Sequence, residues 1–177
     1  ADAMDTKVTL NYSKLSGSQY YDSDYTPAGA DIYGGFGRQD DHETISAEVQ
    51  FTSNGEGPLS WVGGLYYFDQ EADWEWLSSS DTDGDGNPDV IRVPSWGNPN
   101  EDMHTVKSTA IYGQATYELN DMTRLIGGMR FNDDEKTFTG NYDDWEDDAT
   151  TYKLAFERDI DEDRMFYASL STGVRTG

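Results

Sequence analysis

The clearest pattern in this sequence is a two-residue alternation of apolar and polar positions near its C-terminal end. Tyr152, Leu154 and Phe156 alternate with polar or small residues, which is the period of a β-strand with one buried face. A polar segment at 159–163 follows, and then a second run rich in aromatic and small residues. Strands joined by a short turn run antiparallel, so the pattern predicts a β-hairpin over 151–177.

The same alternation recurs along the chain and predicts an antiparallel β-meander. It covers 7–12, 45–52, 107–117 and 124–131, and the aromatic and glycine residues of 60–76 favour a curved strand. Together with the last hairpin, these segments give about seven strands. We therefore predict an all-β fold in a single domain, residues 1–177.

The connections between the predicted strands alternate in length. Short turns are expected at 54–58, 118–121 and 159–163, and long acidic loops at about 13–43, 77–104 and 139–149. In an antiparallel meander, successive connections lie at opposite ends of the sheet. The short turns would then share one rim and the long loops the other, an asymmetry typical of outer-membrane barrels.

Charge and composition narrow the functional classes. The chain has 12 Lys+Arg against 35 Asp+Glu, for a net charge of -23, so its electrostatic field repels nucleic acid. It has no cysteine, which excludes a disulfide framework and thiolate metal sites. No signal-peptide pattern or run of 18 apolar residues is present, so we expect no membrane helix. Membrane β-strands hide their apolar residues in alternation and remain compatible with this composition.

Three stretches, in order along the chain, resemble consecutive barrel strands of TonB-dependent outer-membrane receptors. They are SAEVQFTSNG followed by LSWVGGLYYFDQE, then STAIYGQATYELNDMTRLIGGMRFNDDEK, then YKLAFERDIDEDRMFYASLSTGVRTG. The resemblance implies a non-catalytic segment of a receptor barrel in the outer membrane of a Gram-negative bacterium. The parent protein would import a nutrient such as an iron–siderophore complex. Such barrels have about 22 strands around a plug, whereas about seven strands and no plug or TonB box are recognisable here.

A second hypothesis concerns the same strands without a complete barrel. A sheet of about seven strands has two edges with unpaired backbone groups and an exposed apolar face. Self-association through strand edges or stacked sheets would cover both, giving an extracellular, amyloid-like filament of a released fragment. Calcium bound in an acidic loop could stabilise such a filament.

The candidate calcium site is an acidic segment that matches the first six positions of an EF-hand loop, D-x-D-x-D-G. Its candidate ligands are Asp81, Asp83, Asp85, Asn87 and Asp89. Arg92 stands where an EF-hand requires a bidentate Glu, so the segment is more similar to the short calcium loops of thrombospondin-type repeats. A solvated acidic turn without a cation is the alternative.

Other side chains offer weaker candidates for chemistry. Aromatic residues of the first long loop could stack on a sugar or a chelate, or simply pack on one another; they are Tyr20, Tyr21, Tyr25, Tyr33 and Phe36. His42 and His104 lack the spacing of a metal or acid–base site. We expect Arg124 and Arg130 to pair with neighbouring carboxylates. No catalytic motif is present, so no enzyme activity is predicted.

Overall fold

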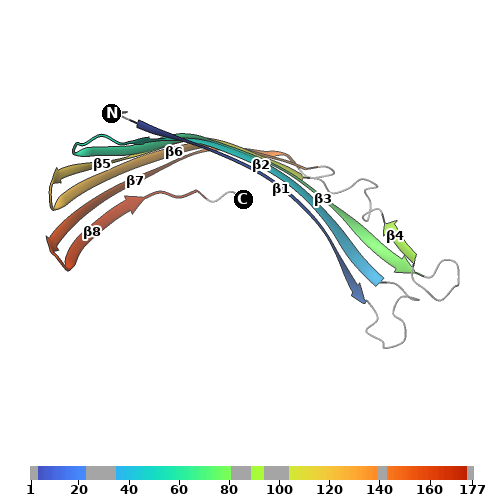
Figure 1. Ribbon diagram of the computed structural model, residues 1–177. Helices are drawn as coiled ribbons and strands as arrows, with labels where there is room; N and C mark the ends of the chain where they lie inside the picture. The colour runs from blue at the N-terminus through green and yellow to red at the C-terminus, as the bar shows by residue number, and fades with distance from the viewer. Residues whose placement is uncertain (1–3, 23–34, 81–88, 94–103, 139–142, 175–177) are drawn as a thin grey trace.

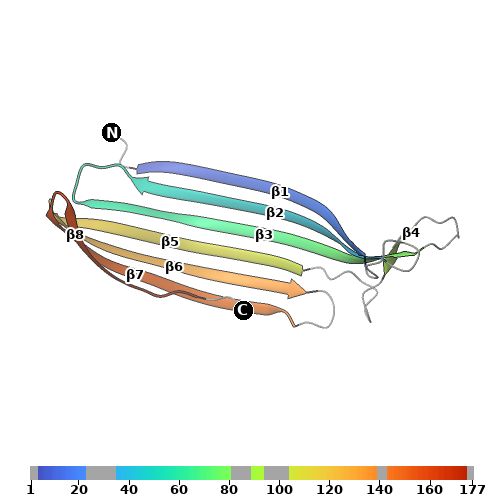
Figure 2. The same cartoon turned by 90° about the horizontal axis from the view of Figure 1, so that it is seen from below.

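The computed structural model describes residues 4–22, 35–80, 89–93, 104–138 and 143–174, and all strands in these ranges belong to one antiparallel sheet (Figures 1 and 2). The strands are β1 (Met4–Asp22), β2 (Gly35–Ser53), β3 (Leu59–Ser80), β4 (Asp89–Val93), β5 (His104–Asn120), β6 (Thr123–Phe138), β7 (Trp145–Asp161) and β8 (Arg164–Ser171). Their order is β1-β2-β3-β5-β6-β7-β8, with β4 paired to the end of β3. The predicted all-β meander of seven strands is confirmed, with β4 in addition.

The strands are longer than the alternation predicted. Residues 13–22 continue β1 and residues 35–43 begin β2, so the predicted loop over 13–43 is wrong for both segments. The loop predicted at 77–104 likewise contains the end of β3, all of β4 and the first residue of β5, and the loop predicted at 139–149 contains the start of β7. The extensions of β1 and β2 carry polar residues on both faces, so they lack the apolar period from which a strand is recognised.

The two classes of connection lie at opposite ends of the sheet, as predicted (Figure 2). The β5–β6 and β7–β8 turns have two residues each, and the β2–β3 turn spans 54–58. The longer connections leave from the other end. No helix with the length and apolar character needed to cross a membrane occurs in the described ranges.

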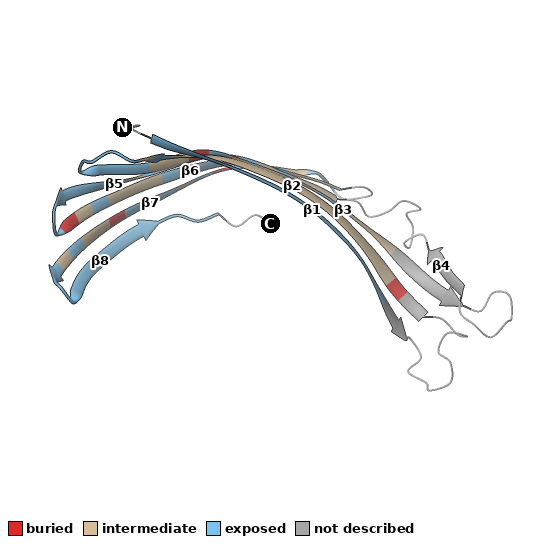
Figure 3. Ribbon diagram, in the orientation of Figure 1, coloured by how far each residue is buried: buried red, intermediate tan, exposed pale blue. Residues whose placement is uncertain are grey.

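The described sheet is a single curved layer and has no conventional core (Figure 3). The buried hydrophobic residues are four alanines, Ala72, Ala110, Ala149 and Ala155, and no large side chain among the described residues is fully buried. An ordinary soluble domain buries one face of its sheet against a second layer. Here the backbone hydrogen bonds between long strands hold the layer together, and both faces remain available for contacts.

Near the short turns, one ion-pair cluster links two adjacent strands. Arg124 on β6 lies 3.2 Å from a carboxylate oxygen of Glu157 and 3.2 Å from one of Asp159, both on β7. All three side chains are partly buried, which makes the cluster stronger than an exposed surface pair. The predicted pairing of Arg124 with carboxylates is therefore confirmed.

Candidate functional site

One face of the sheet carries a continuous band of exposed apolar side chains, here called the apolar face. Strand register places apolar side chains of five strands in one row, the exposed Val8, Leu65, Ile111 and Phe131 together with the half-buried Val49. Val8 is 61% exposed and Ile111 57% exposed. Large apolar side chains in contact with water are unfavourable, so a band of this extent indicates a lipid or protein partner.

The height of this band matches a bilayer core. On β3 it runs from Leu59 through Trp61 and Leu65 to Tyr67, four residues of the exposed face. This stretch is nine residues long, and a tilted strand needs about 9–11 residues to cross the hydrocarbon of a bilayer. The apolar band of outer-membrane barrels is about 25 Å tall and is flanked by aromatic residues. Trp61 and Tyr67 stand close to the two limits of the band.

Beyond Tyr67 the same face becomes strongly acidic, and we call this region the acidic extension. On β3 the alternate positions are Asp69, Glu71, Asp73 and Glu75. On β6 and β7, carboxylates are paired directly with carboxylates. These cross-strand pairs are Asp133 with Asp148 and Glu135 with Glu146. Charges at this density cannot lie in hydrocarbon, so the strands must project beyond the band into water.

The opposite face, here called the polar face, carries a hydrogen-bonded cluster at the height of the band. The Tyr112 hydroxyl on β5 donates to Glu48 Oε1 on β2 at 2.7 Å, and Gln50 Nε2 donates to the same hydroxyl at 3.3 Å. The Arg130 guanidinium lies 5.5 Å from the ring centroid of Tyr66 and 5.8 Å from that of Tyr112. Cation–π contacts and hydrogen bonds thus connect four strands in one cluster.

Gly64 makes this cluster possible because it leaves room for the Tyr112 ring. A Cβ at Gly64 would lie 2.6 Å from the Val49 carbonyl oxygen and 2.7 Å from the Tyr112 hydroxyl oxygen. No side chain fits in that space, so glycine is required by close approach. The Gly63–Gly64 pair was the only local signal in the sequence for this arrangement.

At the end of the polar face near the long connections, basic and aromatic side chains alternate in a patch, here called the distal patch. Arg38 lies 4.8 Å from the Trp74 ring centroid, and Lys136 lies 5.2 Å from that of Trp145. His104 packs on Phe138 with 6.2 Å between ring centroids. Arg38 also forms an ion pair with Asp40. Such a surface can contact an anionic ligand that has aromatic rings.

His104 lies well beyond the apolar band, opposite Ala72 of β3. Burial lowers the pKa of His104, and the nearby His42 and Arg38 lower it further. The imidazole is therefore more completely neutral at pH 7 than an ordinary histidine. In the distal patch it can donate or accept a hydrogen bond, while Arg38 and Lys136 supply the positive charge.

The predicted calcium and aromatic sites lie largely outside the described residues. This holds for Asp81, Asp83, Asp85, Asn87, Tyr25 and Tyr33, whereas only the backbone is described for Asp89, Tyr20, Tyr21 and Phe36. In the described part, no group of three or more His, Asp or Glu side chains is arranged to hold a metal ion. Calcium binding stays a prediction. Calorimetry with calcium on the wild type and on Asp83→Ala would test it, and equal, negligible heats would remove it.

The prediction that Arg130 pairs with a carboxylate is wrong. Its Nε donates to Asn132 Oδ1 at 2.6 Å, and its guanidinium makes cation–π contacts with Tyr66 and Tyr112. Strand register explains this difference, because Arg130 stands opposite Tyr112 on one side and Thr151 on the other. Strand register also places His42 on β2 and His104 on β5 directly on either side of Ala72 on β3.

Solved structures with the same fold include receptors much longer than this chain. The ferric yersiniabactin uptake receptor FyuA from Yersinia pestis matches with a TM-score of 0.69 and 15% identity over 96% of this chain and 25% of that chain. The copper transporter OprC matches with a TM-score of 0.71 and 15% identity over 97% of this chain and 27% of that chain. BauA, the ferric preacinetobactin receptor from Acinetobacter baumannii, matches with a TM-score of 0.66 and 16% identity over 96% of this chain and 28% of that chain.

The chain thus spans about a quarter of the length of these receptors, and at this identity they establish the fold alone. A search of the curated proteins finds no match. A family model described as "TonB dependent receptor-like, beta-barrel" matches residues 1–177, the whole chain. The chain therefore belongs to the TonB-dependent receptor-like β-barrel family.

Proposed function

We propose that this chain forms part of the barrel wall of an outer-membrane receptor that takes up a nutrient in a Gram-negative bacterium. The observation that carries the proposal is the division of one sheet into two faces. The apolar face has a band of bilayer height, and the polar face carries hydrogen-bonded and basic groups. A barrel wall needs both faces at once, lipid outside and a polar interior inside. The proposal gives the chain no catalytic role.

The distal patch supports a more specific proposal for the nutrient, an anionic metal chelate with aromatic rings. Arg38 and Lys136 supply positive charge, and Trp74 and Trp145 supply flat apolar surface beside each cation. In a chain with a net charge of -23, two cations beside tryptophan rings are a local exception, and Arg38 is also paired with Asp40. Ferric chelates are named for two of the structural relatives and copper for a third. Their shared feature is a metal cargo, which fits this proposal.

Site-directed labelling can test the orientation of the wall, because the chain has no cysteine of its own. Nitroxide labels would be attached to single cysteines in the full-length receptor in outer-membrane vesicles, after any cysteine outside the 177 residues has been replaced by serine. Labels at Leu65→Cys and Leu154→Cys should collide with oxygen dissolved in lipid. Their polar-face counterparts, Gln50→Cys and Gln114→Cys, should collide with a water-soluble nickel chelate. Equal access to water at all four positions would contradict the membrane assignment.

Uptake measurements test the proposed nutrient. Lys136→Ala and Arg38→Ala should each lower the uptake of a radiolabelled ferric chelate by several-fold. The reason would be weaker binding of the chelate to the receptor, which is the step before transport. Lys107→Ala is the matched control. Lys107 lies on β5 opposite Glu135, on the acidic extension, and therefore on the face of the sheet away from the distal patch. If Lys107→Ala lowers uptake as much as the patch variants, the distal patch does not bind the chelate.

A second candidate function, self-association of the 177-residue chain, is favoured by its sheet edges. β1, with 19 residues, and β8 have no strand paired to their outer sides in the described residues. The charges of β1 balance, Asp5 and Asp22 against Lys7 and Lys14, and the one charge of β8 is Arg164. Edge strands usually resist pairing through repelling charge, and these two are weakly protected.

Electron microscopy of the purified chain in detergent-free buffer would test this candidate. Ordered fibres with a strand repeat of about 4.7 Å would support it. Introducing Thr9→Lys and Asn11→Lys on the open edge should then suppress the fibres. Monodisperse particles of a single chain would exclude it.

A further inference from the structure

Two half-buried cations on the polar face, Arg130 on β6 and Lys153 on β7, have no carboxylate partner among the described residues. Other cations of the described chain form ion pairs, for example Lys14 with Glu43. Arg130 stands opposite Thr151, so Lys153 is its diagonal neighbour on β7. Diagonal neighbours lie about 7–8 Å apart, within reach of long side chains. The two positive charges repel each other, and one anion between them would neutralise both.

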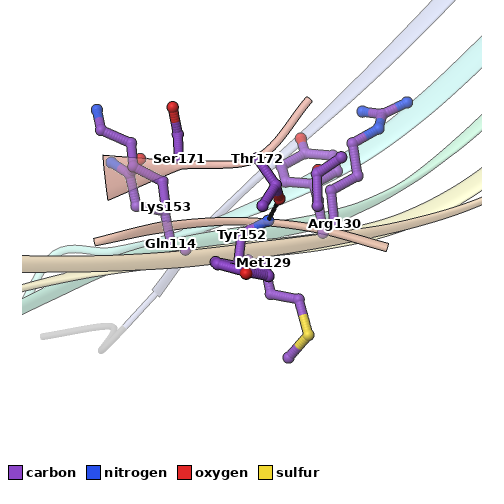
Figure 4. A pocket seen from close by; sticks show the side chains of 11 residues that line it. Gln114, Met129, Arg130, Tyr152, Lys153, Ser171 and Thr172 are labelled. Carbon is purple, nitrogen blue, oxygen red and sulfur yellow. Dashed lines mark hydrogen bonds between the residues drawn. The ribbon is translucent and has the colours of Figure 1, made fainter. Parts of the chain in front are cut away.

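Arg130 and Lys153 flank a notch of about 280 Å³ in the polar face, which Gly128 also lines. Figure 4 shows both cations and Ser171 on one side of the sheet and Met129 on the other. Gly128 stands directly opposite Lys153 in the register, so its missing side chain leaves the space between the two cations open. Pockets for drug-sized ligands have about 300–1,000 Å³. The notch is below this range and suits a small ion.

The groups around the notch are suited to an anion. None of the eleven described residues that line it is Asp or Glu, although these two types make up 35 of the 177 residues in the chain. The amide of Gln114 on β5 and the hydroxyl of Ser171 on β8 join the two cations, so donors come from four neighbouring strands. A tetrahedral oxyanion can accept from several sides, whereas a planar carboxylate is best bound by two parallel hydrogen bonds from one guanidinium.

The guanidinium of Arg130 is held in place before any ion binds. Its Nε donates to Asn132 Oδ1 at 2.6 Å, and it makes cation–π contacts with Tyr66 and Tyr112. Its terminal nitrogens donate to no acceptor among the described residues, so they are available to an ion. Glu48 accepts a hydrogen bond from the Tyr112 hydroxyl at 2.7 Å and is engaged there. A positioned guanidinium loses less freedom on binding than a mobile one.

From this geometry we infer that the notch is a binding site for a small tetrahedral oxyanion of the phosphate class, held between Arg130 and Lys153. A phosphate monoester carries about −1.5 to −2 charges at pH 7, which matches the two cations. Free inorganic phosphate and a phosphate group on a larger solute share this chemistry. Arg130 lies six residues before Lys136 on β6, or about 20 Å at about 3.3 Å per residue. The notch is therefore separate from the distal patch and does not depend on the solute bound there.

Lysine acylation in the purified full-length receptor tests this site. N-Hydroxysuccinimide acetate acylates accessible lysine amines, and mass spectrometry of the peptides gives the rate at each position. Inorganic phosphate should slow the acylation of Lys153 several-fold at an ionic strength held constant with sodium chloride. Lys7 is the internal control, because register places it on the same face, on β1 and away from the notch. Its rate should not change.

Separate probes identify the source of the phosphate group. Protection of Lys153 by both inorganic phosphate and glycerol phosphate would support a site that accepts a phosphate group on a larger solute. Protection by inorganic phosphate alone would support a site for the free ion. Succinate at the same concentration and ionic strength should protect Lys153 much less, because its planar carboxylates cannot use donors on several sides of the notch.

Matched variants separate a bound ion from general attraction by the two cations. Gly128→Ala keeps both charges and places a Cβ in the notch, 3.4 Å from Gln114 Cγ, which is an ordinary contact. It should weaken the protection of Lys153 by phosphate several-fold. Gly127→Ala is the control, because its Cβ would lie on the other face, 3.7 Å from Leu154 Cδ2. This variant should keep the protection of the wild type.

Arg130→Gln should abolish the protection of Lys153, because one of the two cations is lost. Absence of protection by either phosphate probe in the wild type would overturn the inference, as would equal protection of Lys7 and Lys153. Equal protection in the two glycine variants, Gly128→Ala and Gly127→Ala, would also overturn it.

Two further outcomes would exclude the site as stated. Stronger protection of Lys153 by succinate than by phosphate would exclude the phosphate class. A Lys153 amine that is unreactive without phosphate and unchanged by it would show that another part of the receptor fills the notch. The nitroxide labels at Leu65→Cys and Gln50→Cys report the membrane assignment independently, so a failed anion site is distinguishable from a failed barrel wall.

Discussion

The two halves of each long strand, compared along the apolar face, meet different surroundings. On this face of β3, the half near the short turns carries Leu59, Trp61 and Leu65, whereas the other half begins with Asp69 and Glu71. Backbone pairing is continuous through both halves. Hydrogen bonding alone therefore maintains the strand, and the side chains only decide which solvent surrounds it. The apolar part and the acidic part of each strand are one element.

The largest effect on stability is expected from a charge placed in the middle of the apolar band. Met129 on β6 is 61% exposed and stands opposite Gly113. Met129→Arg should destabilise the folded receptor in lipid vesicles by about 2–4 kcal/mol, the cost of a cation near the bilayer midplane. Urea unfolding followed by tryptophan fluorescence would measure it.

Asp133→Arg is the matched control, because it adds the same side chain to the same face of β6, four residues further along. There the arginine meets water and stands opposite Asp148. An opposite-charge pair on a strand is worth roughly 0.2–1 kcal/mol, so no loss of stability is expected. Equal losses for the two variants would show that the band and the acidic extension share one environment.

The second test concerns packing on the polar face behind the band. Gly64→Ala puts a Cβ 2.6 Å from the Val49 carbonyl oxygen and displaces the Tyr112 ring. Overpacking of this kind costs about 1–3 kcal/mol. Gly113→Ala is the control, because its Cβ would have Val62 O at 3.7 Å as its nearest neighbour. The idea of a required glycine fails if the two unfolding free energies change equally.

The comparison also separates what the sequence could predict from what it could not. Alternation was visible where one face is apolar, so the meander and the order of its short turns were predicted correctly, whereas residues 118–120 and 159–161 of the predicted turns belong to β5 and β7. It was invisible in residues 13–22 and 35–43, because both faces are polar there. The cluster around Tyr112 joins residues 62 and 64 positions apart, and its geometry depends on register that no local pattern reveals. Arg130 was assigned the wrong partner for the same reason.

A third and smaller effect is expected within the acidic extension. Asp133 and Asp148 stand directly opposite each other on the same face of the sheet. Asp148→Asn should stabilise the receptor by about 0.2–1 kcal/mol at low ionic strength, because like charges on adjacent strands repel. The gain should shrink in 1 M salt, where screening is nearly complete. A gain that does not depend on salt would mean that repulsion is not its cause.

The smallest expected effect is at the β7–β8 turn, on the water side of the band opposite the acidic extension. The Arg164 guanidinium donates to the Asp161 carboxylate, and this hydrogen bond is the main cause of a pKa below the ordinary 3.8 at Asp161. A carboxyl whose pKa is lowered by folding stabilises the folded state above the unfolded value. That contribution is lost as the pH falls from about 3.8 through the lower folded value.

Asp161→Asn should accordingly be slightly less stable than the wild type at pH 7 and equal to it at a pH below the folded value. Unfolding free energies of both proteins across this range would show the difference closing as the pH falls. Because both partners are exposed, the effect should be much smaller than that of Met129→Arg. A difference that persists unchanged in acid would mean that Asp161 acts through the geometry of the turn, by accepting from the Asp163 backbone N–H, and not through its charge.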